Sequence, residues 1–307
     1  MKRVVITGAT GMISIALIKY LISQDIEVLA IINPNSIRKN DIPINKLVTI
    51  IERDISQLSN LVNSISKKYD IFYHFAWTGT FGDSRNDVCM QNLNIKYTLD
   101  AVQLASLLGC NTFIGAGSQA EYGNVSCKLS SDIIANPNSA YGIAKYTTGK
   151  LSSIYAEKLG LKHIWTRILS IYGPYDGENT MITSSIKKLL SKQKPLYTKA
   201  GQIWDYLYCD DAARAFYLIG EKGKNKTIYC LGSGEERHLY DYITKMRDII
   251  DPSLEIGLGE IEYNPNQVMF LSADITELTR DTGFLPNFSF EQGIKETIEW
   301  YKSEIVK

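Results

Sequence analysis

The chain has 307 residues, 45% of them hydrophobic and 21% charged, which is enough for one large core or one core and a smaller lobe. Lysine plus arginine and aspartate plus glutamate number 33 each, so no overall field would attract a nucleic acid or an acidic membrane. Five scattered cysteines without C-x-x-C spacing and only three histidines predict free thiols and no metal site.

The first residues lead directly into an apolar run at Arg3 to Thr7 that is typical of a buried strand. This start leaves no room for a signal peptide, and no later apolar run approaches the length needed to cross a membrane. We therefore expect no membrane segment and a cytoplasmic location.

A glycine turn follows this strand and precedes the helical pattern at residues 15–22. Gly8 permits a tight turn, Gly11 lets the backbone approach a pyrophosphate, and the helix N-terminus offers free N–H groups. Ser14 replaces the third glycine of the usual fingerprint and is also small. The pattern predicts a dinucleotide site, with a plain turn as the alternative, and its contacts would come from Gly8, Thr10, Gly11, Met12 and Ile13.

The end of the next predicted strand, Glu27 to Ile32, bears on the choice of dinucleotide, because an acidic residue there binds the ribose hydroxyls of NAD. Here the position is Asn33, and the loop becomes basic at Arg38, which suits a 2′-phosphate. NADP(H) is favoured and NAD(H) is possible, since a solvated basic loop is the other explanation. Further contacts are predicted from Ser36 and, after a strand at residues 48–52, from Asp54 and Ile55.

Two more strands are predicted at Ile71 to Trp77 and at Thr112 to Gly115, with a helix at Asp87 to Leu108 between them. His74 lies inside an apolar strand and is predicted to be packed rather than to act as a base. Ser118 follows the later strand, at the end where doubly wound folds place their chemistry, and its hydroxyl can bind a carbonyl oxygen.

A tyrosine and a lysine four residues apart, Tyr141 and Lys145, would lie on one face of a helix. A free tyrosine is a poor acid at neutral pH, and a nearby cation lowers its pKa by favouring the phenolate. Tyr146 and Lys150 have the same spacing, so spacing alone does not choose between the two pairs.

Taken in order, these features resemble an extended short-chain dehydrogenase/reductase of the NAD-dependent epimerase/dehydratase type, a family that acts largely on nucleotide-sugars. The resemblance covers nearly the whole chain, and it selects Tyr141 and Lys145 because Pro137 and the distance to Ser118 fit that pair. The motifs are the T-G-x-x-G turn at residues 7–11, His74 to Trp77, Asn94 with Thr98, Ser118 before Tyr122 and Gly123, Pro137, Arg167 before Tyr172, Gly173 and Pro174, Gly201 to Tyr206 with Asp210 and Asp211, Gly232 to Gly234, and Gly283 to Pro286 ahead of Trp300 and Tyr301.

The resemblance implies that Tyr141 is the general acid/base, that Lys145 lowers its pKa and holds the nicotinamide ribose, and that Ser118 orients the sugar oxygen. It also implies an α/β fold, a doubly wound parallel (Rossmann) sheet with a smaller, interleaved C-terminal substrate lobe. The dinucleotide domain would comprise residues 1–172 and about 205–232, and the lobe residues 173–204 and 233–307. Such proteins commonly form homodimers through the helix at 87–108 and the Tyr141 helix. Additional cofactor contacts would come from Phe75, Ala76, Trp77 and Asn94.

Departures from the family pattern limit the chemistry. Gln119 and Ala120 stand where 4,6-dehydratases carry an acid and a base, and Glu121, one position later, would face the other way on an extended backbone. Dehydration is therefore disfavoured. Asn33 argues against the tightly held NAD of an epimerase. We expect NADPH-dependent reduction of a 4-keto (deoxy)sugar nucleotide, with a nucleotide-sugar 4-epimerase as the alternative and a non-catalytic cofactor sensor as a third possibility.

The substrate side differs from the family as well. Ser170 and Trp204 occupy positions where relatives often carry Asn and Arg against the nucleotide diphosphate, and an indole does not replace a guanidinium in anion binding. Loop residues such as Phe81 and Arg85 would line the sugar pocket. Later elements are predicted at Asn179 to Ser191, Trp204 to Cys209, Thr227 to Leu231 and Tyr240 to Ile250, and substrate contacts at Thr78, Gln119, Glu121, Ser170, Asn179 and Trp204.

Overall fold

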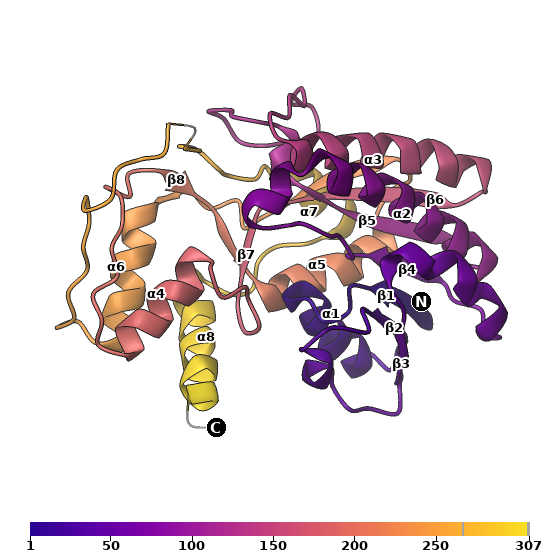
Figure 1. The fold of residues 1–307 in the computed structure, drawn as a ribbon, viewed down its shortest axis with the longest axis horizontal. Coiled ribbons are helices and arrows are strands. Elements are labelled where there is room, and N and C mark those ends of the chain that lie inside the picture. Colours follow the sequence, from indigo (N-terminus) through magenta and orange to yellow (C-terminus); the bar gives the residue numbers. More distant parts are fainter. Residues whose placement is uncertain (266, 306–307) are drawn as a thin grey trace.

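A seven-stranded parallel sheet forms the centre of the protein in a computed structural model that describes residues 1–265 and 267–305 (Figure 1). The strand order is β10-β6-β5-β4-β1-β2-β3, so the chain winds outward from β1 in both directions, and this arrangement confirms the doubly wound fold. The strands are β1 (Arg3–Thr7), β2 (Glu27–Ile32), β3 (Val48–Glu52), β4 (Ile71–His74), β5 (Thr112–Ser118), β6 (Lys162–Ile168) and β10 (Thr227–Leu231).

Helices cover both faces of this sheet, which explains why its strands are nearly continuous apolar runs. Along β1, Val5 packs on one face with side chains of α2 and α3, while Val4 and Ile6 pack on the other with α1 and α5. These helices are α1 (Met12–Ser23), α2 (Val88–Leu107), α3 (Ala140–Lys158) and α5 (Cys209–Lys222).

A smaller group of elements lies beside the sheet, at the left of Figure 1. Its helices pack around an aromatic cluster in which the ring of Tyr242 lies 5.0 Å from Tyr206 and 4.6 Å from Phe290. It contains α4 (Met181–Leu190), α6 (Leu239–Ile250) and α8 (Phe290–Ile305), and the short pairs β7 (Ser170–Tyr172) with β9 (Tyr206–Tyr208) and β8 (Ile203–Trp204) with β11 (Arg237–His238). Helix α7 (Thr276–Thr282) returns to pack on α5 and β10. The proposed boundaries between the two parts stay a prediction.

Several predicted elements end elsewhere. The expected strand at 204–209 is two short strands separated by Asp205, whose buried carboxylate accepts hydrogen bonds from the backbone N–H groups of Ser233, Gly234 and Ala273. Helix α4 starts at Met181 because the Thr180 side chain caps it. The fourth strand is shorter than expected, and the fifth continues to Ser118. Among the described helices, none has the length and apolar character that a bilayer crossing requires.

Candidate active site

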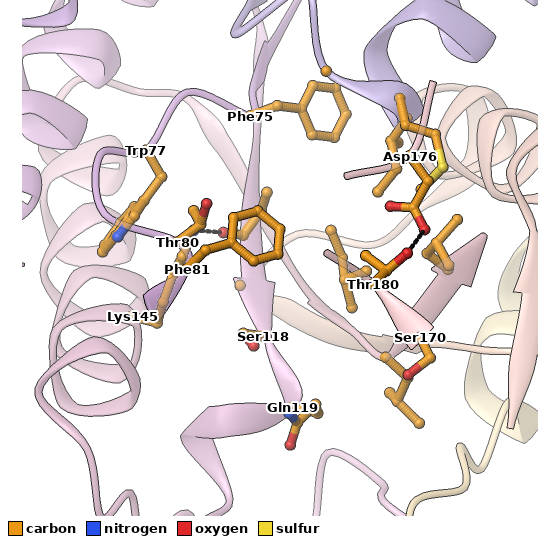
Figure 2. A pocket seen from close by; sticks show the side chains of 18 of the residues that line it. Phe75, Trp77, Thr80, Phe81, Ser118, Gln119, Lys145, Ser170, Asp176 and Thr180 are labelled. Atoms are coloured by element: carbon orange, nitrogen blue, oxygen red, sulfur yellow. Dashed lines mark hydrogen bonds between the residues drawn. The ribbon is translucent and has the colours of Figure 1, made fainter. Parts of the chain in front are cut away.

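A cleft of about 600 Å³ opens at the carboxyl ends of β1, β4 and β5, facing α4, β7 and β8. Figure 2 shows its side chains, with Lys145 and Trp77 on one side, Asp176 and Thr180 on the other, and Ser118 and Gln119 between them. This is the crevice in which open α/β sheets bind ligands, next to the point where the strand order reverses.

The glycine turn after β1 forms one end of the cleft. Gly8 has φ of +68°, and a Cβ there would lie 2.7 Å from the backbone nitrogen of Ala76, so only glycine fits this close crossing. Gly11 caps α1 without any side-chain hydrogen bond, and the buried hydroxyl of Ser14 has no partner among the described residues. Helix α1 thus presents unpaired donors to the cleft beside Met12 and Ile13, which is what a pyrophosphate requires.

A second set of predicted cofactor residues surrounds a hollow of about 140 Å³ at the ends of β2 and β3, and this hollow shares Gly8 and Trp77 with the cleft. The Asn33 amide donates to a carboxylate oxygen of Asp54 at 3.0 Å, and the Ser36 hydroxyl donates to that of Thr10 at 3.1 Å. The lining includes Gly8, Thr10, Asn33, Ile55, Ala76, Trp77 and Thr78. The sequence-predicted cofactor residues are thus divided between this hollow and the main cleft, which contains Met12, Ile13 and Phe75.

Arg38 points to the junction between the two parts of the molecule. Its side chain pairs with Asp41 at 3.2 Å, and its guanidinium carbon lies 5.6 Å from the centre of the Tyr175 ring. The Arg38 backbone N–H donates to the Ser36 hydroxyl, which keeps this loop folded back toward Thr10.

Asn94 does not line either cavity, contrary to the prediction. It is fully buried, its Oδ1 accepts from the backbone N–H of Thr78 and its Nδ2 donates to the Thr78 carbonyl, both at 2.9 Å. Asn94 thereby holds the loop after β4. His74 is hydrogen-bonded between the Thr7 and Thr98 hydroxyls, and burial lowers its pKa to about 3, so it is a neutral packed side chain.

Tyr141 and Ser118 meet because α3 approaches the end of β5 closely. A Cβ on Gly142 would lie 2.4 Å from the carbonyl oxygen of Ala120, so glycine at this helix position allows the contact. The Tyr141 side chain is 8% exposed. Burial raises its pKa, while a hydrogen bond with Ser118 and the charge of Arg85 lower it.

Lys145 also lies near Tyr141, with its ammonium 5.7 Å from the centre of the Tyr141 ring, and its expected lowering of the Tyr141 pKa stays a prediction. The residue is 4% exposed, and its ammonium donates to the carbonyl oxygen of Ala116 at 2.6 Å and lies 3.7 Å from the centre of the Trp77 ring. Burial lowers the pKa of Lys145 to about 7. The competing pair is different, since Lys150 is exposed and both it and Tyr146 line a separate small cavity.

Glu121, which was predicted to contact substrate, does not line the cleft. Its carboxylate is 1% exposed and accepts hydrogen bonds from the Ser118 backbone N–H, the Trp165 indole N–H and Arg167 Nε at 2.8 to 2.9 Å. Trp165 and Arg167 line a separate small cavity together with Glu121. Glu121 therefore fixes the turn that carries Ser118, and Gln119 is the residue of this turn that reaches the cleft.

The opposite wall of the cleft contains both predicted and unpredicted residues. The Trp204 indole donates to the Ser170 hydroxyl at 2.8 Å, and both line the cleft as expected. Asn179 is exposed and lies outside it, because the turn before α4 directs Thr180 inward instead. Thr78 is exposed at the neighbouring hollow and does not line the main cleft.

Asp176 was missed by the sequence reading. Its carboxylate faces the cleft and accepts from the Thr180 hydroxyl at 2.8 Å and from the Gly177 N–H at 2.7 Å. Burial raises its pKa to about 6, against the lowering effect of those hydrogen bonds and of Arg38. Its place directly after the Tyr172, Gly173 and Pro174 motif was the available signal.

The family model for the NAD dependent epimerase/dehydratase family matches residues 4–232, which is most of the chain. The chain belongs to this family. The match includes the glycine turn and the Ser118, Tyr141 and Lys145 set, so family membership and the geometry of the cleft agree.

Individual members of the family are more distant. A dTDP-glucose 4,6-dehydratase of Haemophilus influenzae is 23% identical over 98% of both chains. One from Shigella flexneri is 31% identical over 172 residues, 54% of this chain and 48% of its own, so that match spans about half of the relative's length. The fold is similar to that of a UDP-glucose 4-epimerase of Thermotoga maritima, with a TM-score of 0.88, 23% identity and 99% of each chain covered. A UDP-N-acetylglucosamine 4-epimerase of Methanobrevibacter ruminantium gives 0.89 over the same share at 23% identity.

Proposed function

We propose that this protein reduces the 4-keto group of a nucleotide-linked (deoxy)sugar with NADPH. The observation that carries the proposal is the meeting of Ser118, Tyr141 and Lys145 beside the unpaired N-terminus of α1, with Gln119 and no carboxylate facing the cleft from the turn after β5. Elimination of water needs an acid and a base, and that turn supplies neither, because Glu121 is bound to Arg167.

In this proposal, some residues of the cleft bind the cofactor and others transfer a proton. Gly8, Gly11 and the first turn of α1 would hold the pyrophosphate, and Lys145 would hold the nicotinamide ribose. The nicotinamide supplies the hydride when it is bound. Ser118 donates a hydrogen bond to the ketone oxygen, and Tyr141 gives that oxygen its phenolic proton as the carbonyl becomes an alcohol.

The preference for NADPH rests on the groove at the end of β2. Asn33 is neutral and already bonded to Asp54, so it presents no carboxylate of its own to the ribose hydroxyls. Ser36 and Arg38 follow on the same loop, and a hydroxyl with a guanidinium is a suitable partner set for a 2′-phosphate.

A nucleotide-sugar substrate is supported by family membership and by the names of the relatives. The cleft is wide enough for a sugar between Tyr141 and the Ser170–Trp204 pair, and the Trp204 indole offers a flat surface for a base. We expect recognition of the diphosphate to differ from that of arginine-bearing relatives.

A homodimer through α2 and α3 belongs to the same proposal. Both helices carry exposed apolar side chains, which are Val88, Leu93, Leu107, Ile143, Leu151 and Ile154. A mass measurement in solution that gives a monomer would contradict it. The described structure leaves all five cysteines free, which suits the expected cytoplasmic location.

The test offers the purified protein NADPH with 4-keto sugars linked to CDP, dTDP, GDP and UDP. Stoichiometric oxidation of NADPH with at least one of them is expected, and oxidation with none would overturn the proposal. Cofactor absorbance and mass of the protein as isolated separate the alternative, because a 4-epimerase would co-purify with NAD and show no net redox change.

A further inference from the structure

Arg85 reaches the cleft from the loop between β4 and α2. It lies on a short 3₁₀ helix, Gly82–Asn86, and its guanidinium carbon is 4.2 Å from the centre of the Tyr141 ring. Its Nη1 donates to the carbonyl oxygen of Thr80 at 3.1 Å, and no carboxylate of the described chain forms an ion pair with it. The guanidinium is therefore a cation held against the face of the phenol ring.

The loop that carries Arg85 is anchored at three points. The Gln91 side chain donates to the carbonyl oxygens of Gly79 and Ser84 at 2.7 and 2.9 Å, and the Asn86 side chain accepts from the backbone N–H of Ala140, at the start of α3, at 3.3 Å. The last contact ties the loop directly to the helix that bears Tyr141. The position of Arg85 over the ring is thus part of the folded structure.

The two cations near Tyr141 differ in how permanent their charge is. Lys145 lies 5.7 Å from the centre of the Tyr141 ring, donates to Ala116 and is buried enough for its pKa to fall to about 7. A guanidinium stays protonated at any pH the protein would meet. A cation over a tyrosine face attracts the phenolate more than the phenol, because the ring then carries negative charge.

We propose that Arg85 is a positioning residue that holds Tyr141 ready for proton transfer, by placing a permanent positive charge on the face of its ring. Besides Lys145 of α3, the charged group near Tyr141 is Glu121 of the turn after β5, which opposes Arg85 and forms an ion pair with Arg167. Lys145 of α3 is then left mainly to bind ligand oxygens. The inference depends on the proposed function only for its kinetic test.

The experiment compares Arg85→Gln and Arg85→Lys with the unchanged protein and with Lys150→Gln as a control. Lys150 is a cation over the ring of another tyrosine of α3, Tyr146, at 5.6 Å from the ring centre. Proteins carrying tyrosine labelled with ¹³C at Cζ are titrated by NMR without substrate, and Tyr141→Phe identifies the Tyr141 signal.

Arg85→Gln is expected to raise the Tyr141 pKa by about one unit or more, which is at least about tenfold less phenolate at a given pH below it. Arg85→Lys should restore most of the shift, and Lys150→Gln should leave the Tyr141 signal unchanged. With substrate, the basic limb of the pH profile for reduction should move up by the same amount in Arg85→Gln.

An unchanged Tyr141 titration in Arg85→Gln would overturn the inference, as would a shift of equal size in Lys150→Gln. A shifted titration with no turnover on any sugar nucleotide would support the role of Arg85 and overturn the proposed function instead. The two proposals therefore fail separately.

Discussion

The two walls of the cleft differ in charge. The wall built from β1, α1, β5, α3 and the loop between β4 and α2 presents a helix N-terminus, Lys145 and Arg85. The opposite wall, from β7, α4 and β8, lines the cleft with apolar and hydroxyl side chains, and among its described lining residues Asp176 is the charged one. The groups suited to proton transfer and anion binding thus lie on one wall, whereas the other offers a ligand shape and hydrogen bonds.

Tyr141→Phe tests whether the chemistry belongs to the first wall. The change removes only the phenolic hydroxyl, so turnover should fall by about 10²- to 10⁴-fold while cofactor affinity, measured by direct binding, stays nearly the same. Tyr146→Phe is the matched control and should keep full turnover. Undiminished turnover in Tyr141→Phe would show that the acid is a different residue.

Glu121→Ala tests how much the buried Glu121–Arg167 ion pair stabilises the first wall. It leaves the buried Arg167 guanidinium without its partner at 2.8 Å, and breaking such a pair costs about 3–5 kcal/mol of unfolding free energy. Denaturant unfolding measures the loss. Glu157→Ala, which breaks the exposed pair with Lys226, should cost less than about 1 kcal/mol. Equal losses in the two variants would contradict this account.

Asp176→Asn tests the charge of the second wall. Burial favours the protonated carboxyl in the folded state, so this group binds more protons folded than unfolded between about pH 4 and pH 6, and its contribution to stability is lost as pH rises through that window. The Asn variant should therefore be more stable at pH 7, by up to about 3 kcal/mol, and the advantage should shrink at pH 4. An advantage independent of pH would rule out titration of Asp176 as its cause.

Arg38→Ala tests the junction between the two parts of the molecule, where the Arg38 guanidinium lies over the Tyr175 ring. Loss of a charge-assisted contact should raise the Michaelis constant for NADPH by about tenfold and leave that for NADH nearly unchanged. Lys67→Ala, which breaks the exposed ion pair with Glu27 at the start of β2, is the control. Equal effects on the two cofactors would argue against a 2′-phosphate contact.

Much of the sheet follows from the sequence, since β1, β2, β3 and β10 begin and end at the predicted residues. Strands buried on both faces are continuous apolar runs, and this signal is local. The chain near Asp205 was misassigned because its bend depends on backbone donors 28 to 68 residues away. Such contacts leave no local pattern.

The order of motifs in the sequence predicted the residues that meet in the cleft. It did not predict which of the other polar residues are buried away from it. Ser118, Tyr141 and Lys145 converge, but Asn94 and Glu121 turn inward toward Thr78 and Arg167, partners that are distant in sequence. The identity of the cation over Tyr141 was missed for the same reason. Arg85 and Tyr141 are 56 residues apart in number and meet only through the fold.

Binding of a ligand oxygen to the buried ammonium of Lys145, as proposed above, would be a proton-linked event. With its pKa near 7, the free protein carries a mixture of charged and neutral lysine at neutral pH. A ligand oxygen that accepts from Nζ stabilises the charged form, so binding takes up a fraction of a proton from the buffer. The heat of binding then varies with the ionisation enthalpy of that buffer, and affinity weakens as the solution becomes alkaline.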